Sequence, residues 1–371
     1  MNNSKIGIGI IGLGGFGQFL IKQWGQMEDV QVVASNDQNP AHRHQLSENI
    51  KFYADDNDLL ADPDVQIVSI ATPPYTHADI ALKAIAAGKH VLVEKPLALS
   101  AGDACLIEKA AAKAGVIATV NFMLRYDPLV ESLKQIVTNE VFGKIRRVDL
   151  RNYATQDTVP EGHWFWKPEM SGGILIEHGV HFFDMASWLI GSRAIEVTGL
   201  TVERKPGMED RVFAAVEYET GVVGTFWHSF SRPMELETTS FHMAFDLGEI
   251  EVCGWVPLSA SFWGWTDETG QEKLAQLLPD PAAEIEGFPV KDVRSSEFTY
   301  RVSRNVKGNF VLPKPKLDVY GDCLRSILQD MVFAIRNPKH QLRVTASDGI
   351  QAVAVAEQAT AAARALGKHQ D

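Results

Sequence analysis

The chain has 371 residues, of which 45% are apolar and 22% are charged. This composition is ordinary for a globular protein and leaves no room for long disordered regions. The length exceeds the size at which one hydrophobic core keeps growing, so two domains are expected. The formal net charge of −12 argues against a nucleic-acid binder and against binding to anionic membranes, because phosphate surfaces require clusters of Lys and Arg.

The cysteines and the N-terminus indicate a cytoplasmic protein. Cys105, Cys253 and Cys323 are odd in number and far apart, so neither a disulfide framework nor a CxxC metal site is expected. The N-terminus lacks the small-residue cleavage site of a secretory signal. No stretch approaches the roughly 20 apolar residues that span a bilayer, so no contact with a membrane is expected.

Residues 5–37 predict the first half of a dinucleotide-binding fold: a strand, a glycine-rich turn, a helix and a second strand. The turn has the pattern GxGxxG. Gly12 suits a tight turn, Gly14 allows the backbone to approach a pyrophosphate, and Gly17 allows the helix to pack closely on the strand. The N-terminus of the helix faces the anion. The candidate cofactor contacts in this turn are Gly12, Leu13, Gly14, Gly15, Phe16 and Gly17.

Asp37 ends the second predicted strand, 20 residues beyond Gly17. Its carboxylate can accept hydrogen bonds from a ribose 2′-OH and would repel a 2′-phosphate, which favours NAD over NADP. Two alternatives stay open. Arg43 can help to bind a phosphate if its loop folds back, and Asp37 can instead be a turn residue before Pro40.

Strand and helix patterns continue to alternate after Asp37. Strands are predicted over 65–71 and 90–93, with a helix over 77–87 between them, which indicates a parallel, doubly wound sheet. Ligands of such sheets bind at the carboxyl ends of the strands, where Thr72, Pro73 and Lys95 lie. The alternative for Lys95 is a solvated surface lysine.

The pattern changes after residues 125–128. One helix is predicted over 128–139, and many strand-like segments joined by short turns then predict a mostly antiparallel sheet. A polar stretch near 266–310 is interpreted as a long excursion. Helices are predicted around 319–336 and 346–366.

Residues 172–191, GGILIEHGVHFFDMASWLIG, predict a helix that carries several polar side chains. Residues three and four apart share a helix face, so His181 can touch both Glu177 and His178. A metal site is geometrically possible, but the order HExxH is absent and no other cluster offers a further ligand. Histidines satisfied within a packed helix are a second possibility. The third is acid/base catalysis, in which histidine removes a hydroxyl proton near neutral pH. Asp184 is interpreted as structural, bonded to the backbone or to an Arg or Lys of the other domain.

Aromatic residues cluster upstream of this helix, in HWFWKPEM, and again in SFWGWTD. Aromatic faces stack on the C–H surfaces of sugars, so Trp164 and Trp166 are candidates for a carbohydrate pocket. Packing in the core or at a subunit interface is the alternative for each of them. Trp188, two turns after His181, has the spacing of a core residue.

The order and spacing of GLGGFG, ATPPYTH, AGKHVLVEKPLA, NFMLRYDP and GGILIEHGVHFFDMASWLIG resemble the Gfo/Idh/MocA family of NAD(P)-dependent oxidoreductases. The resemblance runs from about residue 5 to the C-terminal helix. It implies a Rossmann domain over 1–124, then an α/β domain over 125–371 that binds substrate and has an open, mainly antiparallel sheet. The outer face of that sheet is often buried in an oligomer, so a homodimer or homotetramer is expected.

The resemblance also implies roles for single residues. The family's EKP motif falls on Lys95, and its DxGxH motif falls on Glu177, Gly179 and His181, with a glutamate where the family has aspartate. Lys95, Glu177 and His181 are therefore the expected catalytic residues. The remaining expected cofactor contacts are Asp37, Thr72, Pro73, His77, Glu94, Lys95 and Asn121. The expected substrate contacts are Lys95, Arg125, Tyr126, Trp164, Trp166, His178 and His181.

The expected reaction moves a hydride from a secondary alcohol of a sugar or polyol to NAD. His181 removes the hydroxyl proton and Lys95 stabilises the alkoxide, or the two exchange roles. The extra methylene of Glu177 lets it either orient His181 or reach the substrate. Two other functions stay open: an enzyme that oxidises a sugar transiently before elimination or glycoside cleavage, and a non-catalytic nucleotide-binding regulator.

Overall fold

The computed structural model describes residues 5–278 and 281–367. The chain forms two compact units, and each unit is built from several segments. The first unit combines Met1–Met123, Gly162–His181 and Gly321–Glu357, and the second combines Leu124–Glu161, Phe182–Tyr320 and Gln358–Asp371. The chain first passes between the units after Met123, next to the predicted boundary at 124. Two later segments, 162–181 and 321–357, return to the first unit.

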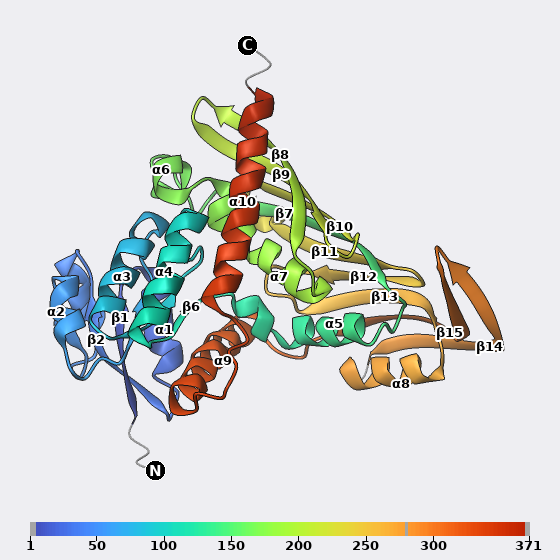
Figure 1. Ribbon diagram of the computed structural model, residues 1–371, viewed down its shortest axis with the longest axis horizontal. Helices are drawn as coiled ribbons and strands as arrows, with labels where there is room; N and C mark the ends of the chain where they lie inside the picture. The colour runs from blue at the N-terminus through green and yellow to red at the C-terminus, as the bar shows by residue number, and fades with distance from the viewer. Residues whose placement is uncertain (1–4, 279–280, 368–371) are drawn as a thin grey trace. The chain divides into compact units, whose positions relative to one another are not determined.

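The first unit contains a six-stranded parallel sheet (Figure 1). Its strands are β1 (Ile6–Ile11), β2 (Val30–Asn36), β3 (Lys51–Tyr53), β4 (Ile67–Ile70), β5 (His90–Val93) and β6 (Ala118–Val120). The order β3-β2-β1-β4-β5-β6 reverses its direction between β1 and β4, the point at which doubly wound sheets bind dinucleotides. The predicted Rossmann sheet is confirmed.

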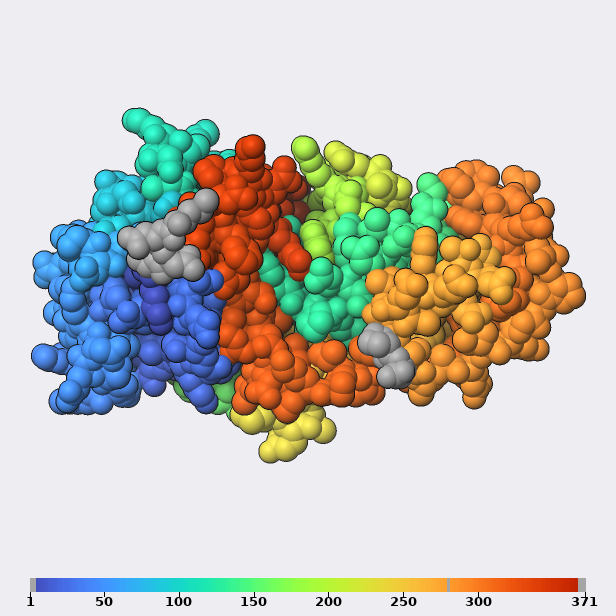
Figure 2. Space-filling view, turned by 90° about the horizontal axis from the view of Figure 1, so that it is seen from below, coloured from blue at the N-terminus to red at the C-terminus, as the bar shows by residue number. Residues whose placement is uncertain are grey.

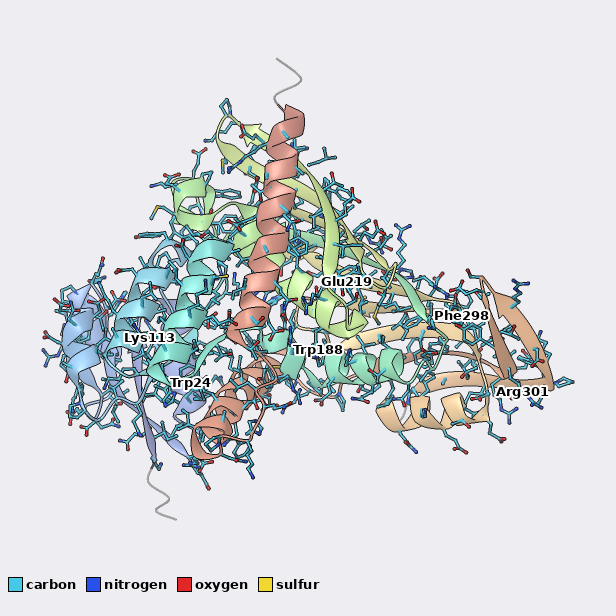
Figure 3. All side chains as sticks on the ribbon, viewed as in Figure 1. Trp24, Lys113, Trp188, Glu219, Phe298 and Arg301 are labelled. Carbon is cyan, nitrogen blue, oxygen red and sulfur yellow. The ribbon has the colours of Figure 1, made fainter. Side chains whose placement is uncertain are left out.

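Helices cover this parallel sheet, and polar side chains define where they begin. The helices are α1 (Gly15–Trp24), α2 (Asp56–Ala61), α3 (His77–Ala86) and α4 (Ala101–Ala114), with short 3₁₀ turns η1 (Pro40–Gln45) and η2 (Pro74–Thr76). Asp55 caps α2 and Ser100 caps α4 through side-chain oxygens that accept backbone N–H bonds, which satisfies donors that a helix start leaves unpaired. Trp24, labelled in Figure 3, is 1% exposed and donates its indole N–H to the Leu324 carbonyl at 3.0 Å. This bond fixes α9 (Lys316–Arg336) to α1 within the first unit.

The second unit contains a nine-stranded sheet in the order β14-β15-β13-β12-β11-β7-β10-β9-β8. Only the pair β7–β10 is parallel among the strand pairs described, which confirms the mostly antiparallel sheet predicted for this part of the chain. The strands are β7 (Ile145–Thr155), β8 (Ala194–Lys205), β9 (Met208–Tyr218), β10 (Val223–Arg232), β11 (Thr238–Phe245), β12 (Gly248–Cys253), β13 (Ser259–Thr266), β14 (Ala282–Ser295) and β15 (Phe298–Val311).

One face of the nine-stranded sheet is buried and the other is open. Buried residues alternate with half-buried ones along β9 and β11 and mainly with exposed ones along β13, as expected for strands with one packed face. Two helices, α5 (Pro128–Thr138) and α7 (Val180–Ile190), lie over the packed face (Figure 1). Phe183 of α7 meets Phe226 of β10 edge to face, with ring centroids 4.8 Å apart.

The polar stretch near 266–310, interpreted as a long excursion, has regular structure that the sequence did not predict. The segment contains α8 (Glu268–Leu277) and the hairpin of β14 and β15. Most of β14 is exposed, so its sequence lacks the apolar alternation by which a half-buried strand is recognised. In Figure 2 the orange atoms of α8 and of this hairpin form an extended surface of the second unit.

The remaining elements agree with the predicted helices except at two points. They are η3 (Met123–Tyr126), η4 (Trp164–Trp166), α6 (Pro168–Ser171), η5 (Leu175–Gly179), η6 (Met234–Leu236) and α10 (Ala346–Gly367). The predicted helix over 172–191 begins as a single π-helical turn, η5, before it continues as α7. Trp188, predicted to be a core residue, is only half-buried, and the cations of Lys134 and Arg125 lie 5.8 and 5.9 Å from its ring centroid (Figure 3). No helix in the described part of the chain has the length and hydropathy to cross a membrane.

Candidate active site

The glycine-rich turn between β1 and α1 has the geometry that a dinucleotide requires. Gly12 has φ of +98°, and a Cβ there would lie 2.5 Å from the Ala71 carbonyl oxygen. A Cβ on Gly17 would lie 2.0 Å from the Gly12 carbonyl oxygen, so both positions require glycine. Gly14 differs, because a Cβ there would meet nothing within 4 Å. Its open surface, at the N-terminus of α1, suits the close approach of a pyrophosphate.

Asp37 directs its carboxylate onto this turn. Its Oδ2 accepts the Leu13 N–H at 2.7 Å, and its Oδ1 accepts the Asn39 N–H at 2.7 Å. The Nδ1 atom of His42 lies 3.1 Å from Oδ2. Burial raises the pKa of Asp37, but the hydrogen bonds from Asn39, Leu13 and His42 outweigh it and hold the pKa below its usual range. An anionic group therefore borders the cofactor turn, while Arg43 is exposed.

Glu94 and Asn121 lie at the carboxyl ends of β5 and β6. The Asn121 side chain donates to Glu94 Oε1 at 2.6 Å, and the Asn121 backbone N–H donates to Val93 at 2.8 Å. Burial raises the pKa of Glu94 to about 7, although the Asn121 hydrogen bond and the Lys95 charge oppose this. The strand ends thus bring together two of the predicted cofactor contacts.

Thr72, Pro73 and His77 form a bonded turn after β4. The hydroxyl oxygens of Thr72 and Thr76 are 2.6 Å apart, and Thr76 donates to the Pro73 carbonyl at 2.8 Å. His77 is fully buried, with Nδ1 2.7 Å from the Pro96 carbonyl oxygen and Nε2 2.8 Å from the Thr72 carbonyl oxygen. Both ring nitrogens therefore face the backbone, and any effect of His77 on a cofactor passes through the turns that it holds.

Lys95 is paired with Glu177, 82 residues away in sequence. Its ammonium donates to Glu177 Oε1 at 2.6 Å and to the Glu177 backbone carbonyl at 2.9 Å. The two side chains are only 16% and 11% exposed. Glu177 lies in η5, and such π-helical turns are frequent at functional sites. The Glu177 side chain therefore reaches Lys95. The sequence predicted that it would either orient His181 or reach the substrate, and this contact is neither of the two.

His178 and His181 follow Glu177 in the first unit. Burial lowers the pKa of His178 to about 3, and the charge of Lys95 acts in the same direction, so His178 is neutral near pH 7. The rings of His178 and His181 have centroids 6.2 Å apart, and Phe122 lies 6.4 Å from His181. His181 itself is 7% exposed.

The two predicted tryptophans of the 164–166 turn have different surroundings. Trp166 is 8% exposed and meets Phe165 edge to face at 4.9 Å. Trp164 is half-buried beside the His163 ring at 5.0 Å. Trp164 therefore keeps more aromatic surface for a ligand than Trp166 does.

Arg125 and Tyr126 belong to the second unit, so the structure does not group them with Lys95. Arg125 makes a bidentate pair with Asp184, through Nε to Oδ2 at 3.0 Å and Nη2 to Oδ1 at 2.6 Å. Both residues are buried, at 6% and 2% exposure. Asp184 is thus bonded to an arginine, as its structural interpretation requires, but the arginine belongs to the same unit. Tyr126 is half-buried.

Three features of the site had no signal in the sequence. These are the contact of His42 with Asp37, the raised pKa of Glu94, and the pairing of His77 with the Pro96 carbonyl. All three depend on where folding places the neighbours. Across residues 5–278 and 281–367, no group of three or more His, Cys, Asp or Glu side chains is arranged to hold a metal ion.

Known proteins share both parts of this architecture. Residues 6–122 match the family model described as an oxidoreductase family with an NAD-binding Rossmann fold, and residues 130–251 match the GFO/IDH/MocA C-terminal domain. The parallel sheet and the glycine turn form a dinucleotide-binding domain, and the matched models identify an NAD(P)-dependent oxidoreductase. The chain belongs to the Gfo/Idh/MocA family.

Individual relatives are distant. The chain is 28% identical to scyllo-inositol 2-dehydrogenase (NAD(+)) of Bacillus subtilis over 60% of its own length and 67% of the relative's. It is 29% identical to myo-inositol 2-dehydrogenase of Thermotoga maritima over 60% of its length and 68% of the relative's. The crystal structure of the WlbA dehydrogenase from Bordetella pertussis, in complex with NADH and UDP-GlcNAcA, has a TM-score of 0.75 at 21% identity, covering 98% of this chain and 97% of that one.

Proposed function

We propose that the protein is an NAD-dependent dehydrogenase that oxidises a secondary alcohol of a sugar or polyol. The observation that carries the proposal is the contact of Lys95 with Glu177, in the same unit as His181 and the glycine-rich turn. The names of the two inositol dehydrogenases support the substrate class. WlbA was crystallised with a sugar nucleotide, which agrees with the same class.

The residues that would hold the cofactor fit a dinucleotide. The open surface at Gly14 and the start of α1 suit the pyrophosphate, and the Asp37 carboxylate suits a ribose 2′-OH. Because hydrogen bonds keep Asp37 anionic, we infer a preference for NAD over NADP. Bound nicotinamide supplies the acceptor for the hydride.

Lys95 is assigned as the residue that binds the alcohol oxygen. A lysine ammonium has three N–H donors, and two of those of Lys95 are directed to Glu177. The third remains for a substrate hydroxyl, where it stabilises the negative charge that develops as the proton leaves. The carboxylate of Glu177 pairs with the ammonium at low exposure, which offsets part of the cost of removing the lysine from water.

His181 is assigned as the general base that removes the hydroxyl proton. His178 stays neutral near pH 7 because of its burial, so it serves as a hydrogen-bonding group for a second hydroxyl of the substrate. Trp164 offers a partly exposed ring against which the C–H face of a sugar can stack.

A screen of monosaccharides, inositols and glycosides with NAD and with NADP tests the proposal. Absorbance of the reduced cofactor is followed, and mass spectrometry of the products detects reactions without net reduction. His181→Ala should lower kcat by about 10²–10⁴-fold while the Kd for NAD changes little. Turnover like that of the wild type in His181→Ala would refute the assignment of the base. Elimination or glycoside cleavage without accumulated NADH would replace the dehydrogenase by the transient oxidation cycle.

A further inference from the structure

His77 joins two turns at the carboxyl edge of the parallel sheet. One turn follows β4 and carries Thr72, whose carbonyl oxygen lies 2.8 Å from Nε2. The other follows β5 and carries Lys95 and Pro96, and the Pro96 carbonyl oxygen lies 2.7 Å from Nδ1. The ring is fully buried, so no water competes for either nitrogen. Through Pro96, the imidazole holds the backbone next to Lys95.

The two distances determine where the protons are. A carbonyl oxygen only accepts hydrogen bonds, and a neutral imidazole has one N–H and one lone pair. With a neutral ring, one nitrogen lone pair would face a carbonyl oxygen at 2.7 or 2.8 Å with no proton between them. Two short contacts to two acceptors are both hydrogen bonds only if both nitrogens carry a proton.

We propose that His77 is a doubly protonated positioning residue, whose imidazolium ties the Thr72 turn to the Lys95–Pro96 turn and so places the Lys95 ammonium. The role for Lys95 rests on the proposed function, whereas the protonation of His77 does not. His77 is a positioning residue because its ring contacts backbone carbonyls and is closed to substrate and cofactor alike.

Opposing electrostatic effects act on this ring. Burial is the largest effect and lowers the pKa of His77, and the charge of Lys95 acts in the same direction. The two carbonyl acceptors and the Glu177 carboxylate raise the pKa but leave it below its ordinary value. The charges of Lys95 and Glu177 largely cancel, because the two groups are paired at 2.6 Å. Against this downward shift, the two short carbonyl contacts favour the charged ring, because one of them would have no proton between nitrogen and oxygen in a neutral ring. On α3, Lys83 pairs with Asp79 and Asp56, and on α4 the Asp103 carboxylate bonds to Ser100.

The chain supplies a comparison in His90. It lies on β5 in the same unit, and its Nδ1 accepts the Ile117 backbone N–H at 3.0 Å. An acceptor nitrogen carries no proton, so His90 must be neutral and protonated on Nε2. Burial also lowers the pKa of His90. His90 is half-buried and His77 is fully buried, and the two histidines differ in what their Nδ1 atoms face.

Nitrogen NMR of the full chain tests the protonation. The protein is labelled with ¹⁵N, no ligand is added, and ring signals at pH 7.5 are assigned by their loss in His77→Gln and in His90→Gln. We expect both ring nitrogens of His77 to be bonded to slowly exchanging protons, and only Nε2 of His90. A single ring proton on His77 would overturn the proposal, and this measurement on the wild type does not depend on whether any variant folds.

Kinetics with a substrate found in the screen test the positioning role. His77→Phe keeps a ring but loses both hydrogen bonds, and a displacement of Lys95 by about 1 Å costs on the order of 10²-fold in rate. We therefore expect kcat to fall by about that factor, while the Kd for NAD, measured by tryptophan fluorescence, and the KM change little. His90→Gln should leave kcat unchanged. Equal losses of NAD binding and kcat in His77→Phe would mean that the residue only supports the fold.

Discussion

Gly14 and Gly17 should respond in opposite ways to alanine, although both belong to the same turn. A Cβ on Gly17 would lie 2.0 Å from the Gly12 carbonyl oxygen, whereas real Cβ atoms essentially never approach within 3.0 Å of such an atom. The backbone must therefore move by about 1 Å. Since a backbone oxygen cannot rotate away as a side chain does, the cost lies at the upper end of overpacking, about 3 kcal/mol. For a unit of this size that lowers Tm by roughly 6–12 °C.

Gly14→Ala should instead leave the fold intact and weaken cofactor binding. Gly14 has φ of −60°, which alanine adopts without strain, and its Cβ would meet nothing within 4 Å. The loss of chain entropy in the unfolded state would even stabilise the protein by about 0.5 kcal/mol. A methyl group at the pyrophosphate contact costs about 1–3 kcal/mol, which is roughly 5–150-fold in the Kd for NAD.

Differential scanning calorimetry and titration with NAD separate the two effects. The expected pattern is a lower Tm for Gly17→Ala, and for Gly14→Ala a higher Kd with a Tm that rises by about 1–2 °C. A Tm of Gly17→Ala equal to that of the wild type, or a Kd of Gly14→Ala for NAD equal to that of the wild type, would refute these expectations.

Three other outcomes concern charge and association. Burial raises the pKa of Asp127 to about 7, so the free energy of unfolding should fall as pH rises from about 4, where the unfolded carboxyl titrates, to 7. Asp127→Asn keeps the cap of α5 and should show a smaller fall between pH 5 and pH 8 in urea unfolding. A fall identical to that of the wild type would contradict this. Glu177→Gln should lower kcat by roughly 10–150-fold while the affinity for NAD is retained, because the charge-assisted hydrogen bond from Lys95 contributes about 1.5–3 kcal/mol. Full activity of this variant would show that Lys95 needs no carboxylate. Leu200 and Trp263 are each 52% exposed on the open face of the nine-stranded sheet, so we expect this face to pair with a second copy of the chain. Light scattering should find an oligomer, and the double variant Leu200→Asp, Trp263→Asp should dissociate it. A monomeric wild type would argue against this expectation.

The first unit was predictable because its signals are local. A strand, three spaced glycines and a helix follow one another within residues 6–24, and each glycine has a role that no other residue fills there. The helices α9 and α10 were also recognisable, since long apolar periodic segments predict helices well. By contrast, β14 carries little apolar alternation because most of it is exposed. The sequence of β14 therefore gives no local signal of its pairing with β15.

The contacts of the candidate site were not predictable to the same degree. The spacing of Glu177 and His181 is read on the assumption of an α-helix, but residues 175–179 form a π-helical turn, which changes which side chains share a face. Glu177 then meets Lys95 across 82 residues of sequence. Arg125 and Asp184 are likewise 59 residues apart. Such pairs follow from tertiary packing, which one sequence read by itself does not encode in any local pattern.

The π-helical turn has a consequence for how this site can evolve. One of the two acceptors that hold Lys95 is the backbone carbonyl of residue 177, and a backbone carbonyl survives every substitution of the side chain. The lysine therefore keeps one tether whatever residue stands there, while the side chain sets the charge and the reach of the second. Either an aspartate or a glutamate at this position leaves the hydrogen bond from Lys95 to the backbone carbonyl in place. A lineage can therefore exchange one for the other and adjust the site to a new alcohol while Lys95 keeps at least one hydrogen-bond acceptor.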